Sequence, residues 1–197
     1  MRTTILLLCF LCLLLCACGS SGSSQNSASD AVTATISDST STAQLEPFLL
    51  KSDAGIDGGM LPVQYTCDGA GSSPALSWLN VPTGTKEFAI MMKTLPGDGT
   101  TKWNWVVYGI PATVSSLPKN NSIIGMTGTG SHGTTMVYDG PCSQGPGAKL
   151  YTFTIYALSE SPSLPATADL VTGPVLSSAI SSITLGSATL NMSYARP

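Results

Sequence analysis

Short β-prone runs that alternate with Gly and Pro turns occupy most of this chain, and they limit its fold more than any other feature. Residues 88–92 form an apolar run with polar residues at both ends, which is typical of a buried strand, and residues 105–108 form a second one. Residues 151–157 alternate large apolar side chains with threonines, which predicts a strand with one buried face. We also expect strands at 61–66 and at 184–194. Many short strands with turns between them predict a mainly β, antiparallel fold.

One helix is expected before the last strand. Thr172-Gly173-Pro174 places proline at a first helical position, and apolar residues follow at helical spacing as far as Ile183. The sequence shows no internal repeat and no second domain. Residues 46–197, about 150 residues, suit one domain with one core. The fold class that we predict is an antiparallel β sandwich with a few peripheral helices.

The first 17 residues look like a lipoprotein signal peptide and not like part of the fold. Arg2 supplies a positive start, and the apolar run that follows it is too short to span a bilayer comfortably. The run ends in Leu15-Cys16-Ala17-Cys18-Gly19, which is similar to a bacterial lipobox. Cleavage before Cys18 would follow the small residue Ala17, so we expect residues 1–17 to be removed and Cys18 to be lipidated. An ordinary secretory signal with incidental cysteines is the alternative.

Residues 18–45 are rich in Ser, Thr, Ala and Gly and nearly free of large apolar side chains. Such a segment buries too little surface to offset its ordering entropy, so we predict a flexible tether that carries the lipid at Cys18. Each buried methylene of an acyl chain contributes about 0.8 kcal/mol to membrane attachment. Gly19, and not Asp, follows the cysteine, which resembles outer-membrane sorting in a Gram-negative cell. We therefore expect an exported bacterial lipoprotein anchored at the outer membrane or the cell surface.

Removal of the signal and lipidation of Cys18 would leave Cys67 and Cys142 as the cysteines of the exported domain. Two cysteines in an oxidising compartment are expected to pair. Their disulfide would close a loop of about 75 residues, for which chain entropy gives about 4 kcal/mol of stabilisation. Two buried free thiols are the alternative, because sequence alone does not give the distance between them.

The charges of the chain nearly cancel, with a net charge of −3 at neutral pH. Lys and Arg form no cluster, so nucleic acid is not an expected partner, and the lipid anchor is the expected link to the membrane. Cys67, Cys142 and His132 fall short of the ligand set of a zinc site. Asp53 and Asp57 lack the spacing of a calcium loop. We expect neither a metal nor a cofactor.

Three sequence blocks occur in a fixed order along the predicted domain. They are Tyr65-Thr66-Cys67-Asp68-Gly69 with Ser73-Pro74-Ala75-Leu76-Ser77-Trp78, then Trp103-Asn104-Trp105-Val106-Val107-Tyr108-Gly109-Ile110-Pro111, then Tyr138-Asp139-Gly140-Pro141-Cys142. Together they resemble the phosphatidylethanolamine-binding protein (Raf-kinase-inhibitor-protein) family, in its bacterial branch. The resemblance covers nearly all of residues 46–196 and implies the β sandwich predicted above. It also implies a pocket at one end of the sheet, where the family binds phosphate-type anions and phospholipid headgroups.

The positions that match the family's pocket carry other residues in this chain. The segment that reads Asp-Pro-Asp-x-Pro in the family is 93–98 here, where Asp98 replaces one aspartate or none, depending on one gap. Asn104 stands in place of the histidine before the tryptophan, and keeps a hydrogen-bond donor that cannot change charge near neutral pH. Ser143-Gln144 replaces two prolines, and the His-Arg-Tyr triplet is Lys149-Leu150-Tyr151. Both family histidines are absent from these motifs.

The resemblance still implies non-catalytic binding of a small anion or phosphorylated headgroup by a membrane-tethered protein. Lys149 would supply positive charge, and neutral side chains would supply hydrogen bonds. Trp103 and Trp105 would form an apolar wall, unless they belong to the core. The candidate ligand-binding residues are Thr94, Asp98, Asn104, Trp105, Pro141, Lys149 and Tyr151.

A lapsed pocket on a protein-interaction module is the alternative function, because some family members inhibit kinases or serine proteases. The sequence does not identify a protein partner for such a module. A hydrolase is the least favoured function, because few acid or base groups are expected near the pocket. His132 follows Ser131 in a Gly-rich loop, but Thr129 stands where a Gly-x-Ser-x-Gly motif needs glycine. We expect His132 to lie in a turn near the mouth of the pocket, and we predict that the chain is not an enzyme.

Overall fold

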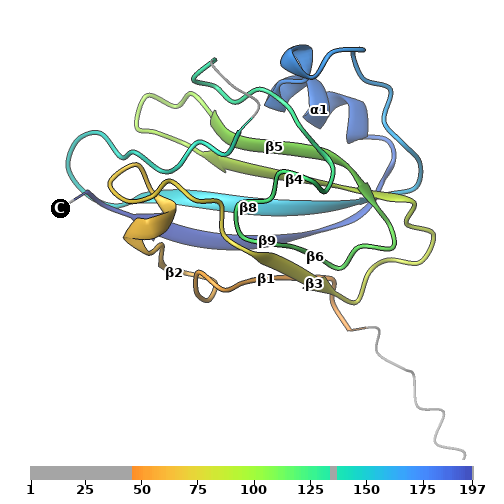
Figure 1. The fold of residues 1–197 in the computed structure, drawn as a ribbon, viewed down its shortest axis with the longest axis horizontal. Coiled ribbons are helices and arrows are strands. Elements are labelled where there is room, and N and C mark those ends of the chain that lie inside the picture. Colours follow the sequence, from red (N-terminus) through yellow and green to blue (C-terminus); the bar gives the residue numbers. More distant parts are fainter. Residues whose placement is uncertain (1–45, 134–136, 197) are drawn as a thin grey trace, which may run out of the picture. The chain divides into compact units, whose positions relative to one another are not determined.

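Two β-sheets pack face to face in the computed structural model, which describes residues 46–133 and 137–196 (Figure 1). The predicted signal peptide, the predicted lipidation site at Cys18 and the predicted tether lie outside the described residues. The smaller sheet has the order β1-β3-β6 and the larger has the order β2-β9-β8-β4-β5-β7. The mainly β architecture expected from the sequence is therefore confirmed.

The strands of the two sheets are antiparallel to their neighbours, with one short exception. The smaller sheet contains β1 (Leu49–Ser52), β3 (Leu76–Leu79) and β6 (Ser116–Leu117). The larger sheet contains β2 (Gly59–Met60), β4 (Glu87–Thr94), β5 (Lys102–Pro111), β7 (Met126–Thr127), β8 (Lys149–Leu158) and β9 (Thr184–Tyr194). The exception is the two-residue pair between β2 and β9, which is parallel. The long strands at 88–92, 105–108, 151–157 and 184–194 follow the sequence prediction.

Strand β4 is buried on both of its faces. Phe88, Ile90 and Met92 point into the core between the two sheets, while Ala89 and Met91 belong to a second core on the outer face of the larger sheet. All five side chains are almost completely buried, and large apolar side chains contribute about 1.5–3 kcal/mol each when they are withdrawn from water. This two-sided burial explains why β4 reads as a continuous apolar run instead of an alternating one.

Helix α1 (Gly173–Ile180) covers the outer face of the larger sheet (Figure 1). The backbone N–H of Val175 donates to Oγ1 of Thr172, which caps the helix, and a proline follows in the first turn. The sequence predicts this start, but the extension of the helix to Ile183 is wrong. The backbone N–H of Ile183 donates to the carbonyl of Ile180, three residues earlier, and β9 begins one residue later.

The predicted strand at 61–66 is also wrong, because this segment contains a short 3₁₀ helix, η1 (Val63–Tyr65). Both the backbone N–H and the hydroxyl of Thr66 donate to the carbonyl of Val63, at 2.9 Å each. These local bonds replace a strand ladder and turn the chain back. A second 3₁₀ helix, η2 (Ala168–Leu170), precedes α1.

The contact between α1 and the sheet leads to a stability prediction. A Cβ atom at Gly173 would lie 2.2 Å from atoms of the Trp103 ring, so Gly173→Ala is expected to lower the free energy of unfolding by about 1–3 kcal/mol through overpacking. Urea unfolding of the two proteins measures the difference. Gly97→Ala is the matched control, because a Cβ at Gly97 meets no described atom within 4 Å. Equal stability of the Gly173 variant and the parent would contradict this account.

Candidate functional site

A cavity of about 490 Å³ lies at the end of the larger sheet where β4 ends and where β5 and β8 begin. In the register of the sheet, Thr94 pairs with Lys102 on one side and with Tyr151 on the other. Loops that follow β4 and precede β8 close the rest of the wall. The residues that line the cavity are Thr94, Pro96, Asp98, Lys102, Asn104, His132, Asp139, Cys142, Ser143, Gln144, Lys149 and Tyr151.

The structure brings together the candidate residues from three separate segments of the sequence. Thr94, Asp98, Asn104, Lys149 and Tyr151 all line this one cavity. Sequence motifs alone did not single out Lys102 or Asp139 as members of the same wall. Asp139 belongs to the third sequence block, where its place next to Gly-Pro-Cys was the available signal.

The two tryptophans and Pro141 do not line the cavity, so the expected apolar wall is wrong. Trp105 is fully buried in the core between the sheets, where its ring meets that of Tyr138 edge-on. Trp103 packs on the opposite face of the sheet, with the core beneath α1. Pro141 is buried and its carbonyl accepts a hydrogen bond of 3.1 Å from the backbone N–H of Cys67.

A β-bulge in β5 separates the two tryptophans and places Asn104. Met92 of β4 pairs with Trp105, and the next residue, Lys93, pairs with Trp103, so Asn104 is the extra residue of the bulge. A bulge changes the direction of side chains along a strand, which explains why residues two positions apart lie on opposite faces. Asn104 is 3 % exposed, and it lines the cavity next to the core.

The orientation of the Asn104 amide is determined by the backbone of Asp139. Nδ2 of Asn104 donates to the carbonyl of Asp139 at 3.1 Å, and the backbone N–H of Asp139 donates to the carbonyl of Asn104 at 2.8 Å. Because a backbone carbonyl can only accept, the amide nitrogen and not Oδ1 must face it. Asn104 therefore joins β5 to the loop that precedes β8.

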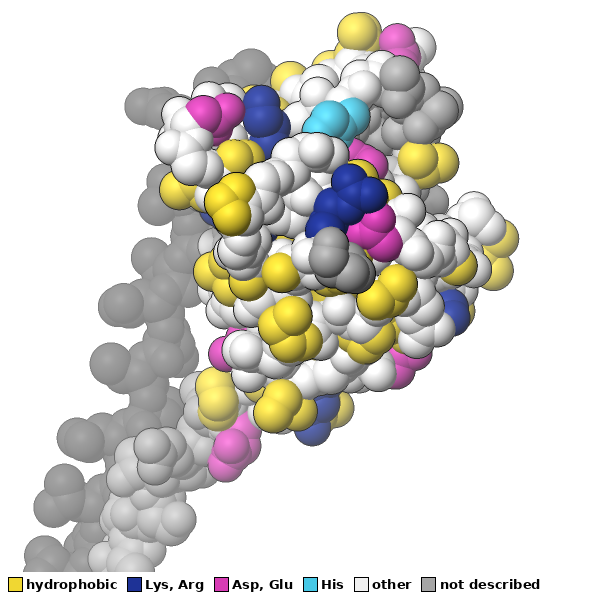
Figure 2. Space-filling model, turned by 90° about the vertical axis from the view of Figure 1, so that its left-hand side faces the viewer, with side chains coloured by type: hydrophobic (Ala, Val, Ile, Leu, Met, Phe, Trp, Pro, Cys, Tyr) yellow, Lys and Arg dark blue, Asp and Glu magenta, His cyan; other side chains and the backbone are white. Residues whose placement is uncertain are grey.

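His132 brings an imidazole to the cavity from a loop outside the family motifs. The backbone N–H of Ser131 donates to the carbonyl of Trp103 at 2.8 Å, and the N–H of Trp103 donates to Oγ of Ser131 at 2.7 Å. These bonds hold the loop along β5, and Nδ1 of His132 pairs with the carboxylate of Asp139. Figure 2 views this end of the molecule, where acidic and basic side chains surround the one histidine. The pair is exposed, so its contribution to stability is small.

The cavity is lined by two lysines and two aspartates, but among the described residues neither lysine forms an ion pair with an aspartate. Lys102 and Lys149 face a wall that also contains Asp98 and Asp139. Within the part of the chain that the structure describes, the ion pairs are His132–Asp139 and Asp68–Arg196, and neither lysine takes part in one. The two ammonium groups are therefore available to an anion.

Tyr151 is a neutral group of the cavity wall. Burial raises the pKa of its phenol above the ordinary value of 10.0, and the negative charge of Asp139 raises it further, while a hydrogen bond with the Cys142 backbone opposes the shift in part. Since the phenol stays protonated at neutral pH, Tyr151 adds no charge to the cavity.

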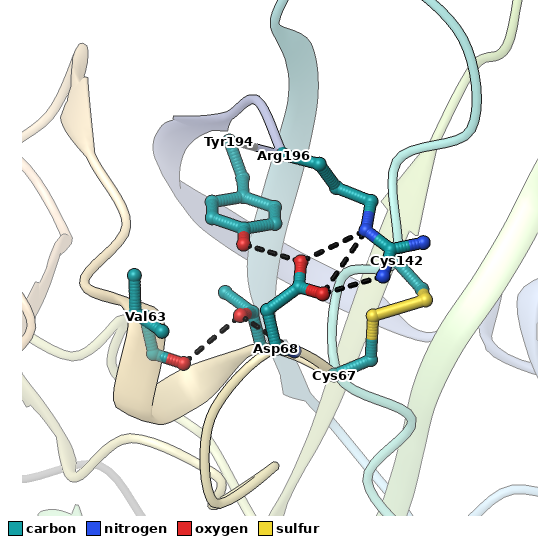
Figure 3. Close-up of polar contacts among 7 residues, drawn as sticks. Val63, Cys67, Asp68, Cys142, Tyr194 and Arg196 are labelled. Carbon is teal, nitrogen blue, oxygen red and sulfur yellow. Dashed lines mark hydrogen bonds and ion pairs between the residues drawn. A yellow bond between two sulfur atoms is a disulfide. The ribbon is translucent and has the colours of Figure 1, made fainter.

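A disulfide and an ion pair hold the cavity wall against the rest of the domain (Figure 3). Cys142, a lining residue, is bonded to Cys67, and their Cα atoms lie 5.3 Å apart. The neighbouring Asp68 accepts hydrogen bonds from Nε and Nη2 of Arg196 and from the hydroxyl of Tyr194. The turn after η1 is thus tied both to the cavity wall and to the end of β9.

These contacts change the titration of Asp68. Hydrogen bonds from Arg196 hold the pKa of the Asp68 carboxyl below its ordinary value of 3.8, and the hydrogen bond from the Tyr194 hydroxyl lowers it further. The same contacts raise the pKa of Tyr194 and of Arg196. A carboxyl whose pKa is lower in the folded protein stabilises the fold at pH values above its ordinary pKa.

The cavity contains residue types found in hydrolases but not their hydrogen-bonded arrangement. His132 and Asp139 form a pair, and Ser143 lines the same cavity. However, Oγ of Ser143 has no hydrogen-bond partner among the described residues, so His132 does not activate it as a base.

Across residues 46–133 and 137–196, no group of three or more His, Cys, Asp or Glu side chains is placed to hold a metal. The helices of this part of the chain are too short or too polar to cross a membrane.

Comparison with protein families identifies one match that covers most of the chain. The family model described as phosphatidylethanolamine-binding protein matches residues 51–195. This range contains β2 to β9 and every lining residue of the cavity.

Two relatives illustrate the sequence similarity. A protein of Aquifex aeolicus named "UPF0098 protein" is 37 % identical over 115 residues, which are 55 % of this chain and 67 % of the relative. A Mycobacterium tuberculosis (strain ATCC 25618 / H37Rv) protein named "Putative lipoprotein LppC" is 33 % identical over 134 residues, which are 67 % of this chain and 66 % of the relative. The matched part is thus about two thirds of the length of each relative.

Two crystal structures share the fold. The phosphatidylethanolamine-binding protein homologue CT736 of Chlamydia trachomatis superimposes with a TM-score of 0.69 at 27 % identity, over 76 % of this chain and 98 % of that one. The Escherichia coli protein YbcL, described as a member of the mammalian family, gives a TM-score of 0.68 at 25 % identity, over 76 % and 99 % of the two chains.

The Asp68 cluster predicts a pH-dependent stability. Asp68→Asn removes the ion pair with Arg196 and should lower the urea midpoint of unfolding at pH 7. The difference between parent and variant should shrink as pH falls below 3.8, because the parent carboxyl then becomes protonated as pH passes through its lowered pKa. Asp169→Asn, at an exposed side chain of η2, is the control. It should leave the urea midpoint of unfolding unchanged both at pH 7 and at low pH. A difference that stayed constant between pH 7 and pH 2 would contradict this assignment.

Proposed function

This chain belongs to the phosphatidylethanolamine-binding protein family, and on that premise we propose that its cavity binds a small anion or a phosphorylated headgroup without converting it. The observation that supports the proposal is the pair of partly buried lysines, Lys102 and Lys149, in a cavity that also carries neutral hydrogen-bonding groups. Neither ammonium is taken up by an ion pair among the described residues. Each lysine acts as a point charge, and together they favour the anionic end of a ligand.

Binding without catalysis fits the polar groups of the cavity. The His132–Asp139 pair lies towards solvent, and the buried Ser143 hydroxyl is not bonded to it. A nucleophile without a base at hydrogen-bond distance stays a neutral alcohol. Among the described residues, the cavity therefore offers charge and hydrogen bonds to a ligand but no activated group to attack it.

We further propose that this domain acts at a bacterial membrane surface as an exported lipoprotein. Residues 1–17 have the pattern of a lipoprotein signal peptide, with Cys18 as the lipidated residue and residues 18–45 as the tether. One relative also carries the word lipoprotein in its name. A tether would let the cavity reach ligands in solution or at the outer membrane or cell surface.

Phosphate should stabilise the protein through Lys149. Titration of inorganic phosphate into the protein, purified in detergent at constant ionic strength, is expected to raise its melting temperature, because saturation at about 100 times the dissociation constant adds about 2.7 kcal/mol. Lys149→Ala should weaken binding at least about tenfold, since a hydrogen bond to a charged group contributes about 1.5–3 kcal/mol. Lys51→Ala, on the exposed side of β1, is the charge-matched control. The proposal fails if the parent shows no shift, or if the Lys149 variant responds like the parent.

The membrane attachment should depend on Cys18. Cys18→Ser should move the protein from the membrane fraction to the soluble exported fraction of a bacterial host, and labelled fatty acid should no longer be incorporated. Cys16→Ser is the matched control, since this cysteine should leave with the signal peptide. Fractionation with labelled palmitate measures both effects. Unchanged labelling of the Cys18 variant would show that another residue, or none, carries the lipid.

A further inference from the structure

The described chain begins at one end of the β sandwich, and the cavity lies at the other end. The ring of Phe48 stacks on that of Phe88, the second residue of β4, whereas the cavity starts at Thr94, the last residue of this strand. The extended chain from Phe88 to Thr94 spans about 20 Å. Figure 1 shows the same arrangement, with the first described residues (orange) at one end of the sheets and the loop before β8 at the other.

Exposed apolar side chains gather at the end where the chain enters. Leu49 of β1 and Leu79 of β3 are cross-strand partners, and their side chains are 39 % and 49 % exposed. Val81, two residues after Leu79, is 39 % exposed. Nδ2 of Asn80 donates to the carbonyl of Pro47 at 3.0 Å, which ties the end of β3 to the segment before β1. We call Leu49, Leu79 and Val81 the entry patch.

The two leucines of the entry patch lie on the outer face of the smaller sheet. Leu50 and Trp78, on the same two strands, are buried in the core, and the side chains that alternate with them point outward and are exposed. Helix α1 packs on the other sheet. Single exposed apolar side chains are common in soluble proteins, but cross-strand partners hold their Cβ atoms about 5 Å apart. Leu49 and Leu79 therefore form one continuous apolar surface.

The predicted tether indicates which surface covers this patch. Residues 18–45 lead directly into Glu46, and a flexible chain of this length has a root-mean-square reach of about 30 Å. With lipid at Cys18, the entry patch stays within this distance of the bilayer. A short flexible linker gives an effective concentration in the millimolar range, so a weak apolar contact is sufficient to keep the domain on the lipid surface.

The charges around the entry patch favour neither an anionic nor a cationic partner. Lys51, Lys86 and Glu46 are all exposed at this end of the domain, so both signs are present. Recruitment by anionic lipid requires a cluster of basic residues. The entry patch instead suits the boundary between headgroups and acyl chains, where leucine side chains insert without a charge requirement.

We propose that the entry patch rests on the membrane that carries the lipid anchor, so that the cavity opens away from this membrane. In this orientation the side chains of Leu49, Leu79 and Val81 enter the interfacial region, and a ligand reaches the cavity from the aqueous side. The inference rests on the proposed lipoprotein attachment. It adds the orientation of the domain, which a flexible tether alone does not determine.

Lysine acetylation of the lipidated full chain in phosphatidylcholine vesicles tests this orientation. Phosphatidylcholine has no primary amine, so a water-soluble N-hydroxysuccinimide ester of acetic acid labels the protein, and mass spectrometry measures the rate at each lysine. Lys51 and Lys86 report on the entry end, and Lys149 reports on the cavity. Compared with the Cys18→Ser protein in solution, Lys51 and Lys86 should react several-fold more slowly on vesicles, and Lys149 should react at the same rate.

Leu79→Glu separates docking from attachment. This variant keeps the predicted lipid anchor but puts a charge into the entry patch, so Lys51 and Lys86 should react on vesicles as fast as they do in solution. Leu150→Glu is the matched control, because Leu150 is an equally accessible leucine, 54 % exposed, at the cavity end of β8. The control should keep both lysines protected. Urea midpoints close to that of the parent verify that the two variants fold.

Equal labelling of Lys51 and Lys86 on vesicles and in solution would overturn the inference, even where the protein stays attached. Slower labelling of Lys149 in their place would overturn it too, because the cavity end would then face the lipid. Protection that appears in solution and grows with protein concentration would identify a second copy of the chain as the occupant instead of lipid. Failure of the lipidated protein to float with vesicles would contradict the attachment itself, and with it the orientation.

Discussion

The burial of β4 from both faces is the constraint on which the rest of the structure depends. One row of its side chains fills the core between the sheets and the other row meets the core under α1. Neither face of the apolar part of this strand is exposed to solvent, so its burial requires both the smaller sheet and helix α1. The cavity begins at Thr94, the buried last residue of β4, because the chain leaves the sheet at the exposed Leu95.

The site combines a rigid floor with walls that are fastened individually. The floor consists of the ends of three paired strands. Pairing in the sheet fixes Thr94 and Tyr151, and hydrogen bonds with the Asp139 backbone fix Asn104. Backbone bonds to Trp103 hold the loop with His132, and the disulfide holds the segment with Ser143. Hydrogen bonds hold one part of the wall and a disulfide holds another, so the wall is attached to the sheets without an apolar core of its own.

The sequence was sufficient for the family, the fold class and most long strands, because periodicity and turn residues are local signals. It was insufficient at 61–66, where side-chain bonds of Thr66 outweighed the β propensity of the run. The position of Asn104 depended on a bulge, which is a property of two paired strands and is invisible in one. His132 was placed in a turn near the pocket, but its pair with Asp139 depended on loop bonds that no motif encodes.

The bulge in β5 also bears on how proteins of this fold diverge. Along a regular strand, side chains alternate between the two faces, so the face that a ligand-end residue occupies is determined by the residues that face the core. The extra residue at Asn104 shifts this alternation by one position between Trp105 and the strand end. Substitutions at the ligand end can then accumulate without altering which side chains enter the core. A scaffold of this kind keeps its shape while the chemistry of its cavity evolves.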